Sequence, residues 1–524
     1  MTDPRSTPPP LLLAALVALS FLFGLFPAWD FDLWGHLAAA QRIVETGSIT
    51  GVDPFLWGVE GRPWIDLYWG FQLIALALFS LGGVSLLVIA KALCAAGAVL
   101  LSIVAQPRGT SQALVASVWL APLVSLSGRC YERPEMASLV LLAAFFAVIA
   151  HAAARPRLLW LLPVLELVWV NLHPFFLFGP LVLLLTFLDR EGAPPKRMLA
   201  AVTGTTLLAC LINPYGITGA LFPIQVIFGQ GQDHLFFKQY IGELRPISFF
   251  LERDPSNPYV LAFVATLSIA IAGVIAAVWA RRARPSRLIL LALFTMLGWS
   301  ATRNVAFFAW VAATVTIAHL HEACAVWRAR REPRSRQQRR RDPGSTARES
   351  GRRSIIAAAA GLGALTLLLV TGVFYNWTGE GRELGLGERS NWYAHAAQRF
   401  LTQPQMPQRA FVSHFGEANL TLFHSVGRVR VFIDPRLEVA SRALFENYLT
   451  VLRSMADGDA RTWEPLLVRD RQWPSILLDR ERSSPQIEGL SRTPGWRAVY
   501  ADELAVVFLR DEVAQAMHLP PVAL

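Results

Sequence analysis

Long apolar segments, separated by shorter polar ones, run along most of the chain. A helix of about 18 or more apolar residues can cross a lipid bilayer. Candidates include residues 11–27, 84–105, 134–153, 259–280 and 355–375. One such segment could be a signal peptide, but many cannot. No small-residue cleavage site is obvious after the first segment, so we expect it to be retained as a first span. The pattern predicts a polytopic membrane protein.

The lysines and arginines between the segments indicate the direction in which each one crosses. Cytoplasmic loops of membrane proteins carry an excess of Lys and Arg. If the N-terminus is cytoplasmic and about eleven segments cross, every strong basic group falls on the cytoplasmic side. Those segments are residues 11–27, 84–105, 112–127, 134–153, 158–170, 175–188, 199–212, 259–280, 288–300, 305–320 and 355–375. The C-terminal region then lies in the periplasm, outside a bacterial inner membrane.

This threading requires that residues 67–81 do not cross. The segment has about 15 residues, fewer than the roughly 20 that a span needs. Trp64, Tyr68 and Trp69 around its start are typical of a membrane interface. We therefore expect a juxtamembrane or re-entrant helix here. If it does cross, all later loops change sides.

The expected fold class is mainly α: a polytopic transmembrane helical bundle with a small C-terminal α/β domain outside the membrane. The expected divisions are a bundle in residues 1–322 with outer loops 28–83 and 213–258, a basic cytoplasmic linker in 323–354, a last span in 355–375 and a periplasmic domain in 376–524. The basic run 328–353 is rich in polar residues, and we expect it to be disordered.

The C-terminal region alternates short apolar runs with longer amphipathic ones. Strands are predicted at residues 410–413, 429–433, 476–478, 498–500 and 505–509, and helices at 444–452 and 463–468. A region of roughly 130 residues is long enough to build a core of its own.

Composition supports the membrane interpretation and argues against two other classes. Only 16% of the residues are charged, against roughly a quarter in soluble domains. The net charge of +10 comes largely from the run 328–353, and a basic block beside a span indicates topology rather than nucleic-acid binding. The four cysteines form no CxxC pair, so no disulfide framework or zinc site is indicated.

Two acids and a histidine follow the first span directly. Asp32 and His36 are four residues apart, so they share a face of the helix expected from Asp32 to Glu45. Leu33, Leu37 and later apolar residues form a stripe that would lie on the membrane surface. Asp30 and Asp32 could serve only to cap the start of this helix. Because two acids here lie close to a histidine one turn away, we weigh a catalytic role equally with that structural role.

Three further polar groups fall on the outer side of the threading, where polar residues at membrane depth often mark function. They are Arg129, Glu132, Arg133 and Glu135 between spans three and four, Asn171 and His173 between spans five and six, and Arg303 before span ten. Each group also has an ordinary interpretation: a self-neutralising loop, a turn or an arginine reaching the interface.

Together these groups place carboxylates, histidines, an amide and arginines at the outer ends of the predicted spans. A carboxylate can act as a general base or bind a divalent metal, and an arginine can hold a phosphate. This set suits transfer from a phosphate-activated lipid donor. No Walker, Rossmann, GxSxG or HExxH pattern is present.

The segment from Asp30 to Gly47 is similar to the first-loop motif of GT-C glycosyltransferases, and in particular of oligosaccharyltransferase catalytic subunits. It resembles more closely a bacterial group of uncharacterised GT-C-like proteins, which share an Asp-x-Asp-Leu-Trp-x-His-Leu start, an Asp-Pro-Phe and a Trp-rich end. Here the last two are residues 53–55 and 63–66. The Trp-Trp-Asp motif of oligosaccharyltransferases is absent, so a peptide acceptor is not supported.

The resemblance implies a role for each of these residues. Asp32 would be the catalytic base or a metal ligand, with Asp30 beside it. Glu132 or Glu135 would be the acid of the second loop, and residues 213–258 the loop that covers the substrate. A divalent cation, Mg²⁺ or Mn²⁺, would be held by Asp32 and Glu132 if one is used. His36, Asn171, His173 and the arginines would contact substrate.

The implied function is transfer of a sugar from a polyprenyl-phosphate-linked donor to an envelope acceptor at the outer face of the inner membrane. The partners are then the lipid donor and membrane lipids, with no nucleic acid. Two alternatives stay open: a transporter or flippase of lipid-linked saccharides, and a non-catalytic assembly protein. In the last case residues 434–438 could bind a partner, although a strand-to-helix turn is the simpler interpretation.

Overall fold

The computed structural model describes the chain outside residues 1–9, 60, 190–193, 230, 336–344 and 469–471. The chain forms two compact units. Unit 1 comprises Met1–Pro27, Val88–Ile212 and His234–Leu386, and unit 2 comprises Ala28–Leu87, Asn213–Asp233 and Gly387–Leu524. Residues of the first outer loop therefore belong with the C-terminal region, whereas the sequence suggested that they belong with the bundle.

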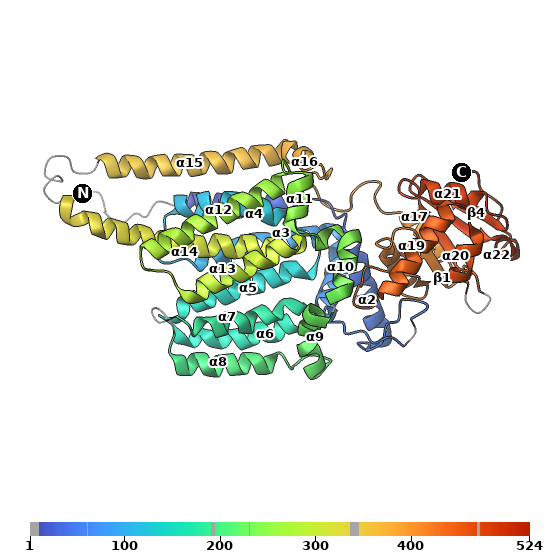
Figure 1. The fold of residues 1–524 in the computed structure, drawn as a ribbon, viewed down its shortest axis with the longest axis horizontal. Coiled ribbons are helices and arrows are strands. Elements are labelled where there is room, and N and C mark those ends of the chain that lie inside the picture. The colour runs from blue at the N-terminus through green and yellow to red at the C-terminus, as the bar shows by residue number, and fades with distance from the viewer. Residues whose placement is uncertain (1–9, 60, 190–193, 230, 336–344, 469–471) are drawn as a thin grey trace. The chain divides into compact units, whose positions relative to one another are not determined.

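Unit 1 is a bundle of helices that run alongside one another (Figure 1). Its main helices are α1 (Leu11–Gly24), the later part of α3 (Trp69–Val104), α4 (Gln112–Ser127), α5 (Pro134–Ala152), α6 (Leu161–Val170), α7 (Phe178–Thr186), α8 (Lys196–Ala209), α12 (Pro258–Trp279), α13 (Pro285–Ser300), α14 (Val305–Ser335) and α15 (Ser345–Val370). Shorter pieces connect them: η1 (Pro156–Trp160), η2 (Pro174–Leu177), α10 (Gly231–Tyr240), η3 (Gly242–Leu244), α11 (Ile247–Arg253), η4 (Thr302–Asn304) and α16 (Val373–Thr378).

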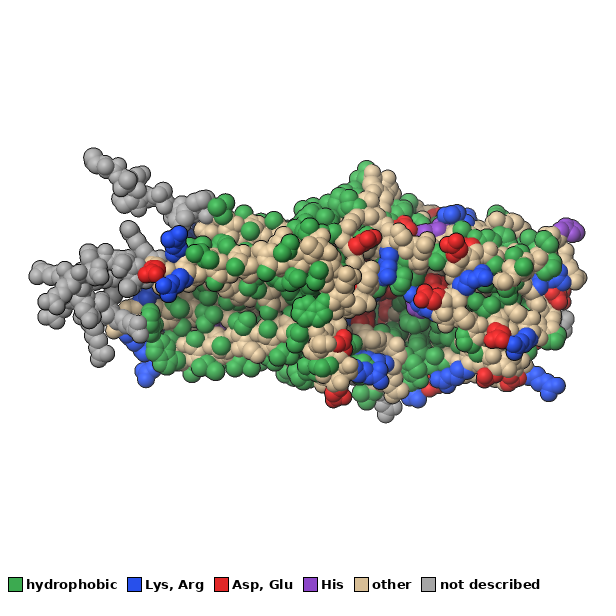
Figure 2. All heavy atoms as spheres, turned by 90° about the horizontal axis from the view of Figure 1, so that it is seen from above, with side chains coloured by type: hydrophobic (Ala, Val, Ile, Leu, Met, Phe, Trp, Pro, Cys, Tyr) green, Lys and Arg blue, Asp and Glu red, His purple; other side chains and the backbone are tan. Residues whose placement is uncertain are grey.

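The bundle carries the hydrophobic surface of a membrane protein. Hydrophobic side chains cover most of the bundle face in Figure 2, and Lys and Arg gather at one end of it. Each of the eleven predicted spans contains a helix. Among the described residues, five helices are long and apolar enough to cross a membrane, and four more are apolar but shorter. The number of crossings therefore stays a prediction.

Helix α14 is the centre of the bundle and packs against α4, α12 and α13. Phe308 and Trp310 are fully buried, and the Trp310 indole Nε1 donates to the Ala98 carbonyl of α3 at 2.8 Å. Gly298 of α13 lies so close to Phe308 that a Cβ there would come within 2.7 Å of it. A small residue at this point lets the two helices approach closely, as membrane helices commonly do.

The expectation of a disordered basic linker is wrong for the part that the structure describes. Helix α14 continues to Ser335 and α15 begins at Ser345, so only residues 336–344 lie outside the described residues, as does Arg190 of another basic loop. Arg, Ala and Glu are good helix formers. Adding turns to an existing helix needs no new nucleation, so the polar composition did not break these helices.

Helix α3 is broken between its two parts. Gly82 and Gly83 have non-helical dihedrals, and Gly83 has φ +60° and ψ −158°, a conformation that is essentially restricted to glycine. The break separates residues 69–81, which belong to unit 2, from the later part of the helix, which belongs to unit 1 from Val88 onward. The segment expected to lie along the membrane is thus a separate helical piece. Whether it crosses stays a prediction.

Unit 2 is built on a five-stranded mixed sheet in the order β2-β1-β3-β5-β4. β1 (Arg409–Val412) runs parallel to β2 (Arg430–Val431) and β3 (Ser475–Asp479), and β5 (Ala505–Arg510) runs antiparallel to β3 and β4 (Trp496–Ala501). Its helices are α2 (Asp32–Thr46), α9 (Gly216–Gly229), α17 (His395–Leu401), α18 (Ala418–Ser425), α19 (Arg442–Ala456), α20 (Ala460–Leu467), α21 (Ser484–Ser491) and α22 (Asp511–Ala516). All five predicted strands and both predicted helices of this region are present.

Helix α2 packs against α18 rather than lying on a membrane surface. Leu33 and Leu37 are fully buried, and the Trp34 ring lies 4.8 Å from that of Phe423 in α18. Asn419 of α18 comes so close to Gly35 that a Cβ there would lie 2.7 Å away. The apolar stripe was predicted correctly but its partner was not, because a sequence pattern cannot tell a protein surface from a lipid surface.

Candidate functional site

Three arginines gather around one carboxylate at one end of unit 1. Arg129, after α4, and Arg133, before α5, both donate to Glu243 Oε2 at 3.0 Å. Arg303 of η4 lies near the same carboxylate. Burial alone would raise the pKa of Glu243, but the three arginines outweigh it and hold the pKa below its ordinary value. Glu243 is therefore ionised, and it holds the arginines together.

The arginine cluster borders a small cavity. Its walls are Arg129, Tyr131, Arg133, Glu135, Met136, Leu139, Arg303, Ala306 and Phe307. Three guanidinium groups are accompanied by two carboxylates, Glu243, which they surround, and Glu135, which lines the cavity, so the cluster has one positive charge in excess. The Nε of Arg303 is buried and has no hydrogen-bond partner among the described residues. Such a cluster can bind an anion, and a phosphate matches guanidinium geometry well.

Glu132 lies elsewhere, in a buried ion pair. Its Oε1 is 2.6 Å from Lys91 Nζ of α3, and both side chains are 1% exposed. Lys91 also donates to the Phe26 carbonyl at 3.0 Å. In this structure the Glu132 carboxylate is thus paired with an ammonium group, and its expected part in binding a metal or substrate stays a prediction. The described residues hold no group of three or more His, Cys, Asp or Glu side chains that could bind one metal ion.

Asn171 and His173 have structural partners. The Asn171 amide donates to the carbonyls of Leu167 and Ile212, both at 2.9 Å, and so connects the end of α6 to the end of α8. The His173 Nδ1 lies 2.9 Å from the Ser138 hydroxyl, which also accepts from Trp169 Nε1 at 2.7 Å. These contacts explain both residues without a substrate.

The predicted catalytic acids lie at the start of α2 in unit 2. Asp30 Oδ1 accepts from the backbone N–H of Asp32 at 3.3 Å, which is the turn that the simpler interpretation expected. Both side chains are half-buried. His36, one turn later, packs edge-to-face against Tyr68 and Phe71, with ring centroids 5.5 and 5.3 Å away. The structure thus holds Asp30, Asp32 and His36 together within unit 2.

A second acidic group in unit 2 was missed from the sequence. It lies where the parallel strands β1 and β3 end, and it consists of His414, Glu417, Asp479 and Arg482. Arg482 Nη1 lies 3.1 Å from Asp479 and 3.7 Å from Glu417. Burial and the Asp479 carboxylate raise the pKa of Glu417 well above its ordinary value.

This second group adjoins the residues around Asp30. The His414 ring lies 5.2 Å from Phe31, the residue between Asp30 and Asp32. The parallel pairing of β1 and β3 could have predicted this group, because the carboxyl ends of parallel strands meet at one edge of a sheet. The strands were predicted, but their parallel pairing was not.

Asp434 belongs to a cluster of charged and aromatic side chains within unit 2. Its carboxylate accepts from the Arg436 backbone N–H at 3.0 Å and pairs with the Arg436 guanidinium at 2.6 Å, which also pairs with Asp53 at 2.7 Å. The Arg436 guanidinium lies over the Trp64 ring at 4.4 Å. The cluster fastens the first outer loop to the C-terminal region within unit 2. The turn interpretation of this segment agrees with these contacts.

Comparison with known proteins gives matches of fold alone. No protein-family model matches the chain, and no curated protein matches it in sequence. The oligosaccharyltransferase AglB of Archaeoglobus fulgidus, solved with an inhibitory peptide and a dolichol-phosphate, is 12% identical with a TM-score of 0.59; the match covers 90% of this chain and 69% of that one. ArnT of Cupriavidus metallidurans, solved with undecaprenyl phosphate, is 13% identical with a TM-score of 0.52; the match covers 95% of this chain and 97% of that one. This chain therefore has the fold of the GT-C glycosyltransferase superfamily.

Proposed function

We propose that the chain is a membrane glycosyltransferase. It transfers a sugar from a polyprenyl-phosphate-linked donor to an acceptor of the cell envelope, at the outer face of a bacterial inner membrane. The observation that carries this proposal is the arginine cluster of Arg129, Arg133 and Arg303 in a chain with the GT-C fold. Two proteins of this fold were solved with a polyprenyl or dolichyl phosphate, which supports a lipid phosphate as the group recognised.

The arginines serve the leaving phosphate. As the bond between the anomeric carbon and the phosphate oxygen breaks, negative charge grows on the phosphate. Guanidinium groups already in place stabilise that charge without reorganisation. Glu243 keeps Arg129 and Arg133 in place through its two hydrogen bonds, so its part is to position them.

Asp32 serves the acceptor. A hydroxyl of the acceptor attacks the anomeric carbon, its proton passes to the Asp32 carboxylate, and the configuration at that carbon inverts. Asp30 holds the start of α2 through its hydrogen bond to the Asp32 backbone. A divalent cation bound at Asp32 would polarise the reacting oxygens. Glu132, the second ligand that the sequence suggested, is paired with Lys91 in the structure.

Asp32→Asn tests the base. We expect consumption of the lipid-linked sugar in membranes to fall by about 10²–10⁴, with normal amounts of folded protein. Asp457→Asn, an exposed residue of unit 2, is the matched control and should leave turnover unchanged. Normal turnover by a folded Asp32→Asn protein would refute the assignment. Movement of intact lipid-linked saccharide across the membrane without any sugar transfer would support the transporter instead.

Arg303→Gln tests the phosphate site in the same assay. A charge-assisted hydrogen bond contributes about 1.5–3 kcal/mol, so we expect kcat/KM for the lipid donor to fall by about 10–100-fold. Arg253→Gln removes an exposed arginine in unit 1 outside the cluster and should have little effect. Equal loss in both variants would mean that general charge, not the cluster, attracts the donor.

A further inference from the structure

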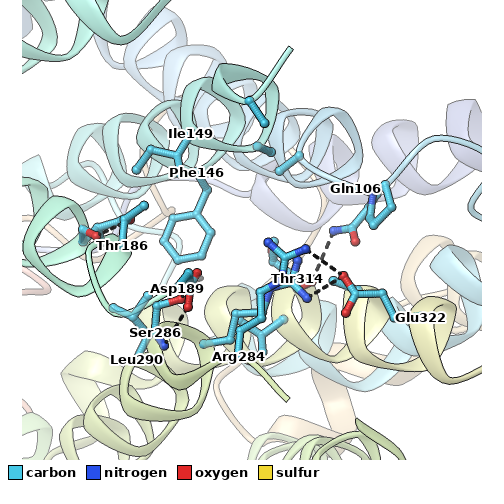
Figure 3. Close-up of a pocket in the computed structure, with 18 of the residues that line it drawn as sticks. Gln106, Phe146, Ile149, Thr186, Asp189, Arg284, Ser286, Leu290, Thr314 and Glu322 are labelled. Atoms are coloured by element: carbon cyan, nitrogen blue, oxygen red, sulfur yellow. Dashed lines mark hydrogen bonds and ion pairs between the residues drawn. The ribbon is translucent and has the colours of Figure 1, made fainter. Parts of the chain in front are cut away.

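A second cavity lies at the other end of helices α5 and α13 from the arginine cluster. It has a volume of about 300 Å³. Figure 3 shows residues of α5, α7, α13 and α14 around it, with Gln106 at the end of α3. The predicted cytoplasmic loops begin here. Arg284, Arg287 and Pro194 are part of its wall, and Arg281 and Arg282 precede it in sequence.

One side of the cavity is charged. Arg284 and Arg287 both donate to Glu322 Oε1, at 3.5 and 3.0 Å. Asp189 is already satisfied, because it accepts from the Ser286 backbone N–H at 3.3 Å and from its hydroxyl at 2.6 Å. Its charge therefore caps the start of α13. Two guanidinium groups thus face two carboxylates, Asp189 and Glu322, so this side has no net charge. Each guanidinium has five N–H donors and donates one hydrogen bond to Glu322, which leaves several N–H donors for a ligand.

A neutral polar group lies beside the arginines. Gln106 donates to the Ser102 and Thr314 carbonyls at 2.9 and 3.3 Å. Its Oε1 is buried and has no hydrogen-bond partner among the described residues. An unpartnered buried acceptor carries a cost unless something donates to it. A hydroxyl on the ligand would meet that need.

The other side of the cavity is apolar. Phe146, Ile149 and Ala150 of α5, Val182 of α7 and Leu290 of α13 make up this wall. A free phosphate ion would use only the arginines. An amphiphile with a phosphate head and hydrocarbon chains would use both sides, and basic pockets between membrane helices bind anionic lipid head groups in this way.

We propose that this cavity binds an anionic phospholipid, with its phosphate on Arg284 and Arg287, a head-group hydroxyl on Gln106 and the first methylenes of its chains against α5 and α7. The site is distinct from the proposed donor site and does not depend on sugar transfer. A lipid held there would join the ends of four helices and of α3, and so would stabilise unit 1.

The test measures thermal unfolding of the full chain in neutral detergent. Phosphatidylglycerol should raise the unfolding midpoint by about 2–4 °C, and one molecule should stay bound in native mass spectrometry. Phosphatidylcholine at the same mole fraction and inorganic phosphate at the same concentration should do neither. If inorganic phosphate gave the same rise, or phosphatidylcholine did, the assignment of an anionic lipid would be wrong.

Variants separate the charged side from the apolar side. Arg284→Gln with Arg287→Gln removes the donors, and adding Glu322→Gln avoids leaving that carboxylate buried and unpaired. This triple variant should lose the response to phosphatidylglycerol. Arg281→Gln with Arg328→Gln removes two exposed arginines that do not line the cavity and should keep the response.

Ala150→Trp places a large side chain on the apolar wall, where it fills part of the cavity, and it leaves every charge in place. It should also abolish the response to phosphatidylglycerol. The proposal is refuted if the triple variant or Ala150→Trp responds as the wild type does. It is equally refuted if the Arg281/Arg328 control loses the response, because general surface charge would then explain the binding.

Discussion

The environment of each acidic residue in this chain depends on which basic residue lies beside it. Glu132 and Glu135 are three positions apart and looked equivalent in the sequence. In the structure Glu135 borders the arginine cluster, whereas Glu132 pairs with Lys91. Lys91 was the missed signal, because a lysine inside an apolar segment needs a buried partner. A charge in a span therefore helps to assign the acids of neighbouring loops.

Asp66 in unit 2 makes a residue-scale prediction about pH. Burial raises its pKa to about 7, against about 3.9 in an unfolded chain. The folded state then holds the proton more tightly, so stability falls as the pH rises from about 4 to about 7. Asp66→Asn removes this dependence and keeps an acceptor for the Tyr68 backbone and Gln72, which donate at 3.1 and 2.9 Å.

The measurement for Asp66 is the unfolding midpoint of wild type and variant at several pH values. We expect the variant to gain on the wild type steadily as the pH rises from about 4 to about 7. At each pH the midpoint of the wild type is subtracted from that of the variant, so the contributions of other groups with shifted pKa values cancel in the difference. A constant difference at every pH would contradict the prediction, and Asp457→Asn should give no trend.

At the scale of elements, glycine decides where α3 breaks. Gly83 has φ +60°, and a Cβ added there would have nothing within 4 Å of it, so the constraint is backbone conformation rather than space. Gly83→Ala should destabilise the protein by about 1–3 kcal/mol. Gly97→Ala, in the same helix and also in open space, should be neutral or stabilising by up to about 1 kcal/mol. Unfolding midpoints of both variants test this. Equal effects would mean that the break is not fixed by Gly83.

Elements also show how far the sequence could lead. Apolar length and period predicted α4, α5 and α12 to within a residue or so, because a span must satisfy its backbone internally. The same reasoning failed for the partner of α2 and for the helical ends of the basic linker. Contacts between distant segments, such as the ion pair of Asp53 with Arg436, leave no local pattern in the sequence. For this reason the sequence could not predict which segments of the chain come together in unit 2.

At the scale of the whole molecule, the number of crossings can be measured, because the chain carries its own probe. Cys324 is exposed, while Cys130 and Cys210 are buried. With eleven crossings, Cys324 near the basic end of α14 faces the cytoplasm and unit 2 residue Asp457 faces the periplasm.

A membrane-impermeant maleimide should then label Cys324 only in inside-out vesicles. It should label the variant Cys324→Ser with Asp457→Cys only in right-side-out vesicles. If residues 67–81 cross, both probes change sides together, since every later loop is reversed. Failure of one of the short helices α6 or α8, of 10 and 14 residues, would also reverse both probes, because both helices precede Cys324. If only the Asp457→Cys probe changes sides, the segment between the two probes, residues 355–375, fails to cross.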